Sequence, residues 1–478
     1  MTEERVIVSK IRSRFFPLAF LAAKTTIKAL DLTGHAGGTL PGAIAEAIDP
    51  AFLGDIAKPD QVVFISGTNG KTTTNNLLND LLADNGYHTV TNRVGGNISS
   101  GFASSFARNA TFGGKVKSKL AVMEFDELSG PRIFPFFQPD ILVVTNLFRD
   151  TFSRSATPDF VFDVMNTGIP SGTHLILNAD DMISCRLAPQ CEHRTYFSVA
   201  HLAEDTQEPV GIVSDLTACP LCGGKLRWDY AHLRHLGRAT CESCGFTNPK
   251  PDYEVISVDQ SQHLFTVREN SAPGTPTYTY TLNSYSIVNL YNLLTCIVVA
   301  REMGLTPEQI AASLAHGINI TESRYNEIDY RGHRLISMAS KGENDTATSV
   351  TLDILRRQPG DKAIIIMIAD AYMAKAKDQT EYIGWYYQTD FEVLQDPSVK
   401  QVILYGDTSL DLLVRLRFAG IDPKKTFVAS TPEETADLVD LNKVQHVFYA
   451  HGLYNGGIAD VSRQKILDRL KNMEALHE

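Results

Sequence analysis

The feature that most constrains this chain is a glycine-rich turn between an apolar run and a segment with leucines at helical spacing. The turn reads Ser66-Gly67-Thr68-Asn69-Gly70-Lys71-Thr72-Thr73. The run at 61–66 predicts a buried strand, and the segment at 72–86 predicts a helix. Small residues let backbone N–H groups approach a phosphate, and the start of a helix adds a favourable dipole. The turn therefore predicts a phosphate-binding loop.

Two side chains of this loop carry the expected chemistry. Lys71 would reach the β- and γ-phosphates of a nucleoside triphosphate, and the hydroxyl of Thr72 can bind Mg²⁺. The metal needs a further acid, which in such sheets follows a neighbouring strand. Glu124 closes an apolar run, and Asp126 and Glu127 follow it. We predict that Glu124 completes the magnesium site, because it lies closest to the strand end.

Apolar runs alternate with helical segments along most of the chain, which predicts parallel sheets covered by helices. Further strand candidates lie at 119–125, 140–146 and 173–178. After a helical stretch at 283–312, a second series lies at 333–339, 363–369, 401–406, 425–430 and 446–452, and 462–473 predicts a closing helix. We therefore expect an α/β protein with a central phosphate-loop domain and a C-terminal Rossmann-like domain.

The domain boundaries follow from changes in this rhythm. We expect a helical segment at 1–55, a central ATP-binding domain at 56–315 and a C-terminal α/β domain at 316–478. Residues 216–282 interrupt the central domain with two Cys-x-x-Cys pairs and a Thr- and Tyr-rich alternation, so we interpret them as a small β-rich insertion.

The two cysteine pairs predict a metal site. Cys219 and Cys222 are separated from Cys241 and Cys244 by 18 residues, and a glycine follows each pair. This is the arrangement of a zinc ribbon, in which four thiolates close a tetrahedral, structural site. A redox role for the pairs is the alternative. The histidines between the pairs, His232 and His235, we expect at the surface.

Composition limits the functional classes. Lys and Arg number 44 against 55 Asp and Glu, a formal net charge of −11, which argues against nucleic-acid binding by bulk positive charge. Seven cysteines, an odd number, fit a reducing compartment better than a disulfide scaffold. At the N-terminus, Arg12 and Arg14 precede a short apolar stretch. It predicts either a helix packed on the next domain or contact with an anionic membrane surface, rather than a secretory signal.

Several motifs in a fixed order resemble a known superfamily. The motifs GTNGKTTT, EFDE, TNLFRD, LNADD and YNLLTCIVVA are similar to those of the Mur ligases. The four cysteines, the short N-terminal segment and the sequence YAHGLYNGGIADVSRQ resemble one branch of that superfamily, the MurT family.

The resemblance implies an activity and its partners. MurT-family proteins amidate the α-carboxyl of D-glutamate in lipid II to D-isoglutamine, through an acyl phosphate, during peptidoglycan synthesis. The implied cofactors are ATP, Mg²⁺ and zinc, and ammonia would come from a GatD-like class I glutaminase. No cysteine here lies in a convincing nucleophile elbow, which fits a separate glutaminase. The implied compartment is the cytoplasm, with contact at the inner face of the membrane.

The resemblance also implies a catalytic acid in the C-terminal domain. Asp378 precedes Trp385 at a distance that fits the family pattern if extra residues are allowed. Lys71, in the central domain, is the other residue expected to be catalytic. Asp370 and Asp390 are alternatives, and a solvated loop acid is the plainer interpretation of all three.

Nucleotide contacts are implied at three more positions. Asn289 and Asn292 lie one turn apart on a predicted helix where family members meet the adenine, and Arg324 resembles an arginine that enters the nucleotide site. A helix N-cap network and a linker salt bridge are the corresponding structural alternatives.

Two other functions stay open at this point. The chain could add an amino acid to a carboxylate, as folylpolyglutamate and cyanophycin synthetases do, or it could be a non-catalytic ATP-binding scaffold. The short N-terminal segment and the cysteine pairs argue against the first alternative.

Overall fold

The computed structural model describes residues 12–35, 37–93, 96–111, 113–149, 157–282, 285–316, 325–340, 344–368, 383–453 and 455–475. The chain forms two compact units. Unit 1 comprises Met1–Arg149, Thr157–Pro209 and Asp215–Ile320, and unit 2 comprises Asp150–Ala156, Val210–Ser214 and Thr321–Glu478.

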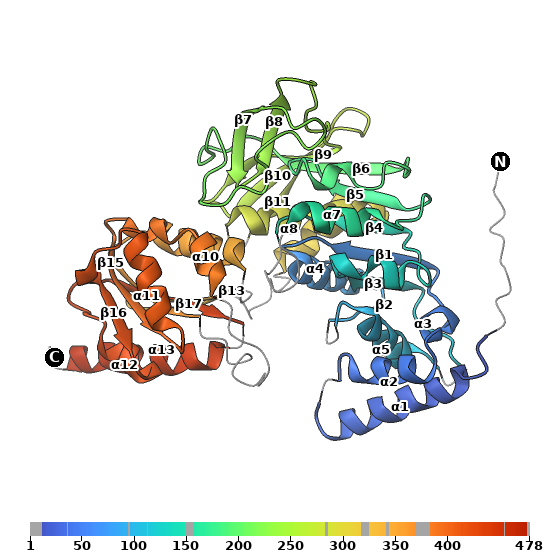
Figure 1. Ribbon diagram of the computed structural model, residues 1–478, viewed down its shortest axis with the longest axis horizontal. Coiled ribbons are helices and arrows are strands. Elements are labelled where there is room, and N and C mark those ends of the chain that lie inside the picture. Colours follow the sequence, from blue (N-terminus) through green and yellow to red (C-terminus); the bar gives the residue numbers. More distant parts are fainter. Residues whose placement is uncertain are drawn as a thin grey trace. The chain divides into compact units, whose positions relative to one another are not determined.

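Unit 1 begins with a cluster of helices, α1 (Phe16–Leu32), α2 (Leu40–Ile48), α3 (Phe52–Asp55) and, later in the chain, α5 (Ser99–Asn109). Figure 1 shows α1 lying along α2. The inner face of α1 places Phe16 and Phe20 against Phe52, with ring centroids 5.2 and 6.3 Å apart. Among the described helices, none combines the length and apolarity needed to cross a bilayer.

A nine-stranded sheet forms the body of unit 1, in the order β11-β10-β9-β6-β5-β4-β1-β3-β2. The strands are β1 (Gln61–Ser66), β2 (Thr89–Val90), β3 (Leu120–Glu124), β4 (Ile141–Val144), β5 (His174–Asn178), β6 (Arg194–Val199), β9 (Tyr253–Asp259), β10 (Leu264–Glu269) and β11 (Thr277–Thr281). Pairing is parallel from β2 across to β9 and antiparallel from β9 to β11.

Helices cover both faces of this sheet, and successive residues of β1 therefore point into different cores. Val62 and Phe64 join the core under α5, α6 (Gly130–Ile133) and α7 (Pro158–Asn166). Val63 and Ile65 join the core under α4 (Lys71–Asp84), α8 (Ile287–Glu302) and α9 (Pro307–Ala315). A strand buried on both sides must be apolar throughout, which is why the sequence of β1 shows no alternation.

The segment predicted as one β-rich insertion, 216–282, divides into two parts. Strands β7 (Leu226–Leu233) and β8 (Leu236–Cys241) form a separate two-stranded sheet that carries the cysteines. Strands β9 to β11 instead extend the main sheet, because Val255, Phe265 and Val267 face the same core as α8.

Unit 2 is a second α/β layer structure with strand order β12-β13-β17-β14-β15-β16. Its elements are β12 (Tyr325–Tyr330), β13 (His333–Ser340), α10 (Asp345–Arg357), β14 (Lys362–Met367), η4 (Gly384–Gln388), η5 (Phe391–Gln395), β15 (Val399–Tyr405), α11 (Ser409–Phe418), η6 (Pro423–Lys425), β16 (Thr426–Ala429), α12 (Pro432–Asp437), β17 (His446–Gly452) and α13 (Gly456–Ala475). All pairings are parallel except that of β12 with β13. The predicted fold class, α/β with a Rossmann-like second domain, is confirmed.

The contact between α2 and α5 provides a test of the packing in unit 1. A Cβ atom at Gly42 would lie 1.9 Å from the carbonyl oxygen of Ser100, whereas a Cβ at Gly172 would meet nothing within 4 Å. We expect Gly42→Ala to lower the free energy of unfolding by about 1–3 kcal/mol, because the helices must move apart. Gly172→Ala is the control. Equal denaturation curves for the two variants would contradict this packing.

Candidate functional site

The turn between β1 and α4 has a backbone that only glycine suits at two positions. Gly67 has φ 122° and Gly70 has φ 90°. A Cβ atom on Gly67 would lie 2.2 Å from Oγ1 of Thr145, and one on Gly70 would lie 2.3 Å from Oδ1 of Asn292. Both glycines are therefore needed for the backbone conformation and for the close approach of neighbouring side chains.

A second loop, the segment 145–148 that follows β4, holds this turn in place. The backbone N–H of Asn69 donates to Oδ1 of Asn146 at 3.0 Å, and Nδ2 of Asn146 donates to the carbonyl of Asn69 at 3.0 Å. Oγ1 of Thr145 donates to the same carbonyl at 2.7 Å. We call residues 145–148 the bracing loop, since its side chains fix the backbone of the glycine-rich turn.

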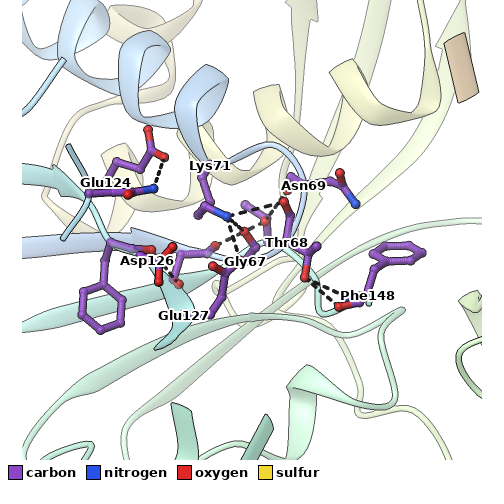
Figure 2. Close-up of polar contacts among 12 residues, drawn as sticks. Gly67, Thr68, Asn69, Lys71, Glu124, Asp126, Glu127 and Phe148 are labelled. Atoms are coloured by element: carbon purple, nitrogen blue, oxygen red, sulfur yellow. Dashed lines mark hydrogen bonds and ion pairs between the residues drawn. The ribbon is translucent and has the colours of Figure 1, made fainter. Parts of the chain in front are cut away.

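The bracing loop also engages Thr68. Oγ1 of Thr68 donates to the carbonyl of Phe148, and the N–H of Phe148 donates to the same Oγ1, both at 3.0 Å. Figure 2 shows Thr68 and Phe148 joined in this way. A single hydroxyl thus ties two loops together, and Thr68 is buried.

Lys71, at the start of α4, is buried and held by both carbonyl and carboxylate oxygens. Its Nζ lies 2.5 Å from the carbonyl of Gly67 and 2.7 Å from Oε1 of Glu127, which is itself buried (Figure 2). A buried ammonium requires such partners, because desolvation without them would disfavour its charge. A cation held beside such a turn is suited to neutralise a phosphate bound there.

The three acids at the end of β3 and just beyond it have different environments. Oε1 of Glu124, our predicted magnesium ligand, accepts a hydrogen bond from Nδ2 of Asn97 at 2.9 Å. Asp126 caps η1 (Glu127–Ser129) by accepting from the N–H of Leu128 at 3.1 Å. The acid in contact with Lys71 is Glu127, which the sequence did not single out because it lies beyond the strand end.

The residues present fit a phosphate and its cation. Thr72 and Thr73 lie half-buried on the first turn of α4. Nδ2 of Asn69 is buried and has no hydrogen-bond partner among the described residues. An orphaned donor beside two obligatory glycines is what a phosphate-binding turn offers before its ligand arrives.

The two asparagines predicted to meet the adenine lie on α8. Asn292 is buried, and its Oδ1 accepts from Oγ1 of Thr74 at 3.3 Å while lying against Gly70. The backbone N–H of Asn289 donates to Oγ of Ser286, which caps the helix. Asn292 thus braces the phosphate turn from the side of α8, and contact of either residue with adenine stays a prediction.

Three predicted residues, Arg324, Asp370 and Asp378, lie outside the described residues. Asp390, the other alternative for the catalytic acid, lies in unit 2, where its Oδ1 accepts from the N–H of Ile212 at 2.7 Å.

The four cysteines converge as a metal site requires. Sγ of Cys219 lies 3.7 Å from Sγ of Cys244, and Sγ of Cys222 lies 3.5 Å from Sγ of Cys241. Tetrahedral zinc with Zn–S bonds of about 2.3 Å places its sulfurs about 3.8 Å apart. The N–H groups of Cys244 and Ser243 donate to Cys241 and lower the pKa of its thiol to about 6, which favours the metal-binding thiolate. The donor set fits zinc.

The expectation that His232 and His235 lie at the surface is wrong. The side chains of both have no exposed area. Nδ1 of His232 lies 2.7 Å from Oδ1 of Asp205, and Nε2 lies 3.0 Å from the carbonyl of Val199. Burial is the largest single influence and lowers the pKa of His232, but the hydrogen bond to Asp205, the charges of Asp180 and Asp205 and the carbonyl of Val199 together raise it above its usual value. No local sequence pattern predicts this burial, because it arises only from contacts of the hairpin with distant segments.

A further group of potential metal ligands lies at the opposite end of β5 from the bracing loop. His174, His193 and Glu302 place one ligand atom each within 4.8 Å of one another. The two imidazoles stack face to face, 3.6 Å apart and 8° from parallel. An ion cannot lie in the plane of both stacked rings, so this arrangement is a ring contact rather than a metal centre.

Sequence comparisons identify the family of the chain. The Mur ligase middle domain matches residues 65–210, and the MurT ligase C-terminal domain matches residues 342–451. The lipid II isoglutaminyl synthase (glutamine-hydrolyzing) subunit MurT of Staphylococcus aureus (strain COL) is 31% identical over 404 residues, which cover 84% of this chain and 87% of that protein. The subunit of the same name from Streptococcus pneumoniae (strain ATCC BAA-255 / R6) is 24% identical over 90% of this chain and 93% of that protein.

Solved structures agree on the fold. A pseudomurein peptide ligase type C from Methanothermus fervidus matches with a TM-score of 0.61 at 19% identity, over 87% of this chain and 79% of that one. The MurF ligase of Thermotoga maritima, solved in complex with ADP, matches with a TM-score of 0.56 at 15% identity, over 90% and 85%. With the identity and coverage of its sequence relatives, this chain belongs to the MurT family of the Mur ligase superfamily.

Proposed function

We propose that this chain is the ATP-dependent synthetase subunit that amidates the α-carboxyl of D-glutamate in lipid II, giving D-isoglutamine. The observation that carries the proposal is the buried Lys71, whose Nζ lies 2.5 Å from the carbonyl of Gly67 on a glycine-dependent turn. Membership of the MurT family supports the choice of reaction, because the related proteins are named as subunits of lipid II isoglutaminyl synthase.

The proposed reaction has two steps. A carboxylate oxygen of the D-glutamyl residue attacks the γ-phosphorus of ATP, the bond to ADP breaks, and an acyl phosphate forms. Ammonia then attacks the acyl carbon, the C–O bond to phosphate breaks, one proton of the ammonia passes to the departing phosphate, and the amide and inorganic phosphate leave. Positioning and charge neutralisation are the main demands of the first step, and a buried ammonium over a phosphate meets both.

Each predicted site residue has a role in this scheme. Thr72 and Glu124 would hold Mg²⁺, which would neutralise charge on the phosphates, and Glu127 is a further acid within reach of Lys71. Asn289, Asn292 and Arg324 are the proposed nucleotide contacts. Asp378 is the proposed acid of the amidation step. The cysteine quartet would hold zinc in a structural role, since four thiolates leave no open position.

The glutaminase that supplies ammonia needs a surface, and α11 offers one. Leu410, Val414 and Phe418 are 66, 49 and 74% exposed at helical spacing, and the ring of Tyr387 lies 6.3 Å from that of Phe418. Exposed charges of both signs, Asp411 among them, border this stripe. Aromatic residues with mixed charges suit a protein partner, so we propose that a GatD-like glutaminase docks on α11.

A lipid-linked substrate calls for membrane contact, and α1 has the matching surface. Phe15, Leu18 and Leu21 are 46, 58 and 53% exposed on its outer face. Two exposed basic residues, Arg14 and Lys28, lie beside this stripe, and the exposed Asp31 near the end of α1 is paired with Arg108. Apolar side chains flanked by basic ones suit an anionic lipid surface, so we propose peripheral contact with the cytoplasmic face of the membrane through α1.

The catalytic proposal predicts different defects for two variants. In a reconstituted complex with glutaminase, lipid II, ATP and glutamine, Lys71→Ala should lower ATP consumption and amidation by at least about a hundredfold, because the phosphates lose their buried cation. Asp378→Asn should keep ATP binding and lose amidation. Lys119→Ala, an exposed lysine of unit 1, is the control. Amidation by Lys71→Ala at the control rate would overturn the scheme, and full activity of Asp378→Asn would remove Asp378 from it.

The cysteine quartet predicts one zinc ion per chain, measurable by plasma mass spectrometry. Cys222→Ser should lose that zinc, because a hydroxyl is a poor substitute for a thiolate. Cys191→Ser is the control, since its sulfur contacts the carbonyl of Pro170 outside the quartet. Zinc retained by Cys222→Ser, or lost equally by both variants, would contradict the assignment.

The exposed stripes on α1 and α11 predict that substitutions in each stripe impair a different interaction. Leu18→Glu with Leu21→Glu should abolish binding to anionic vesicles in a sedimentation assay and leave the glutaminase bound, because acids on α1 repel the lipid. Val414→Asp with Phe418→Asp should do the reverse, measured by size-exclusion chromatography of the complex. Each variant is the control for the other. If a variant keeps both vesicle binding and glutaminase binding, or loses the binding expected of the other variant, the proposed role of its stripe is wrong.

A further inference from the structure

The hairpin of β7 and β8 carries the cysteine quartet at one end and a buried tip at the other. Cys241 ends β8, whereas Arg234 and His235 form the turn, 6% and 0% exposed. Eight residues of β7 span about 25 Å. Arg234 has φ 52°, a left-handed backbone that is uncommon outside glycine. A hairpin tip normally faces water, so a buried and strained one calls for a reason.

His235 reaches the segment that follows β5. Its Nε2 lies 3.3 Å from Oδ1 of Asp181, and its ring centroid lies 4.4 Å from that of Phe148. Neither ring nitrogen of His235 makes a hydrogen bond within the described part of the chain, so its contact with Asp181 is one of charge and proximity. Burial would raise the pKa of Asp181, but the adjacent imidazole and two backbone amides hold it below its usual range. The hairpin tip thus meets a buried carboxylate and an aromatic ring at once.

Both of these neighbours belong to the bracing of the phosphate turn. Oδ2 of Asp181 accepts from the N–H of Leu147 at 2.7 Å, and Oδ1 accepts from the N–H of Ile183 at 2.9 Å. Phe148, the other neighbour, exchanges its two backbone hydrogen bonds with Oγ1 of Thr68. Only two contacts therefore separate the hairpin tip from the turn that would hold ATP.

Backbone contacts lock the rest of the hairpin to the same segment. The N–H of Gly237 donates to the carbonyl of Asp180 at 2.9 Å. Nδ2 of Asn248 donates to the carbonyls of Ala179 and Gly237 at 2.7 and 3.0 Å. The position of His235 is consequently set by the folded hairpin, whose other end carries the cysteine quartet.

We propose that His235 is a positioning residue through which the metal-loaded hairpin holds the bracing loop, and hence Thr68, in the conformation that binds ATP. This rests on the proposed ATP site but assigns a new role to the cysteine-bearing hairpin. If the tip only filled space, replacing His235 would reduce stability alone. A positioning role also changes the affinity for ATP and the protection of the Leu147 and Phe148 amides.

Two substitutions separate these roles in the full chain bound to its glutaminase. His235→Phe keeps a ring against Phe148 and removes the contact with Asp181. His235→Gln keeps a polar N–H group at the position that faces Asp181. The matched control is Arg227→Ala, on the exposed side of the same hairpin, where Arg227 pairs with Asp229. The readouts are the Kd for ATP without lipid II, the thermal midpoint, and hydrogen exchange at residues 145–148.

We expect His235→Phe to raise the Kd for ATP about tenfold, because a buried carboxylate loses its partner and the bracing loop loosens. The exchange of the Leu147 and Phe148 amides should rise with it, His235→Gln should recover most of both losses, and Arg227→Ala should match the wild type. An unchanged Kd and unchanged exchange in a folded His235→Phe protein would overturn the proposal. So would His235→Gln matching His235→Phe in both readouts.

If His235→Phe does not fold, a measurement on the wild-type protein tests the positioning role instead. Removal of zinc with a chelator should raise hydrogen exchange at 145–148 as the substitution does, and returning zinc should reverse it. If hydrogen exchange at residues 145–148 is the same with and without zinc, the proposed coupling between the hairpin and the bracing loop is wrong. This readout needs no nucleotide, so it stays separate from the proposed function, which instead fails if the zinc-loaded complex does not bind ATP.

Discussion

The hydrogen bonds between the bracing loop and the glycine-rich turn are the constraint on which the rest of unit 1 depends. A turn with two left-handed glycines has many conformations open to it, and side chains from the bracing loop and α8 select one. Thr145 and Asn146 hydrogen-bond to the carbonyl and N–H of Asn69, and the side chain of Asn292 packs against Gly70. The buried Lys71 can then act as a fixed cation rather than a mobile one.

The parallel sheet explains why these residues meet although they lie far apart in the sequence. Strands β1, β3 and β4 are neighbours, and all of them end at the same edge. The turn after β1, the acids at the end of β3 and the bracing loop after β4 therefore lie together, although they are far apart in the sequence. This is the general reason why ligand sites of such sheets lie at the carboxyl ends of the strands.

Local patterns were enough to predict most elements, but not the contacts between them. The strand at 446–452 and the helix after the phosphate turn were found because continuous apolar runs and leucine spacing are local signals. The edge strand β12 and the polar-rich β6 were missed, since their sequences alternate weakly. Neither Glu127 as the partner of Lys71 nor the burial of His235 could be predicted, because each depends on a fold that joins distant segments.

The cysteine-bearing hairpin supports the segments around the glycine-rich turn in this arrangement. A closed zinc site would do no chemistry on substrate, but it would fix a hairpin that has only a small core of its own. The hairpin in turn packs against the segment between β5 and β6, beside the bracing loop. The cysteine quartet and the glycine-rich turn are thus parts of one packed body in unit 1.

The central claim is that a carboxylate of lipid II becomes an acyl phosphate at the turn around Lys71. It can be tested by preparing lipid II with oxygen-18 in the α-carboxyl of its D-glutamate and running the complete reaction with unlabelled ATP. The account predicts one oxygen-18 atom in each phosphate released, because the carboxylate oxygen that attacks phosphorus leaves with it. Amidation that yields phosphate without the label would contradict the account.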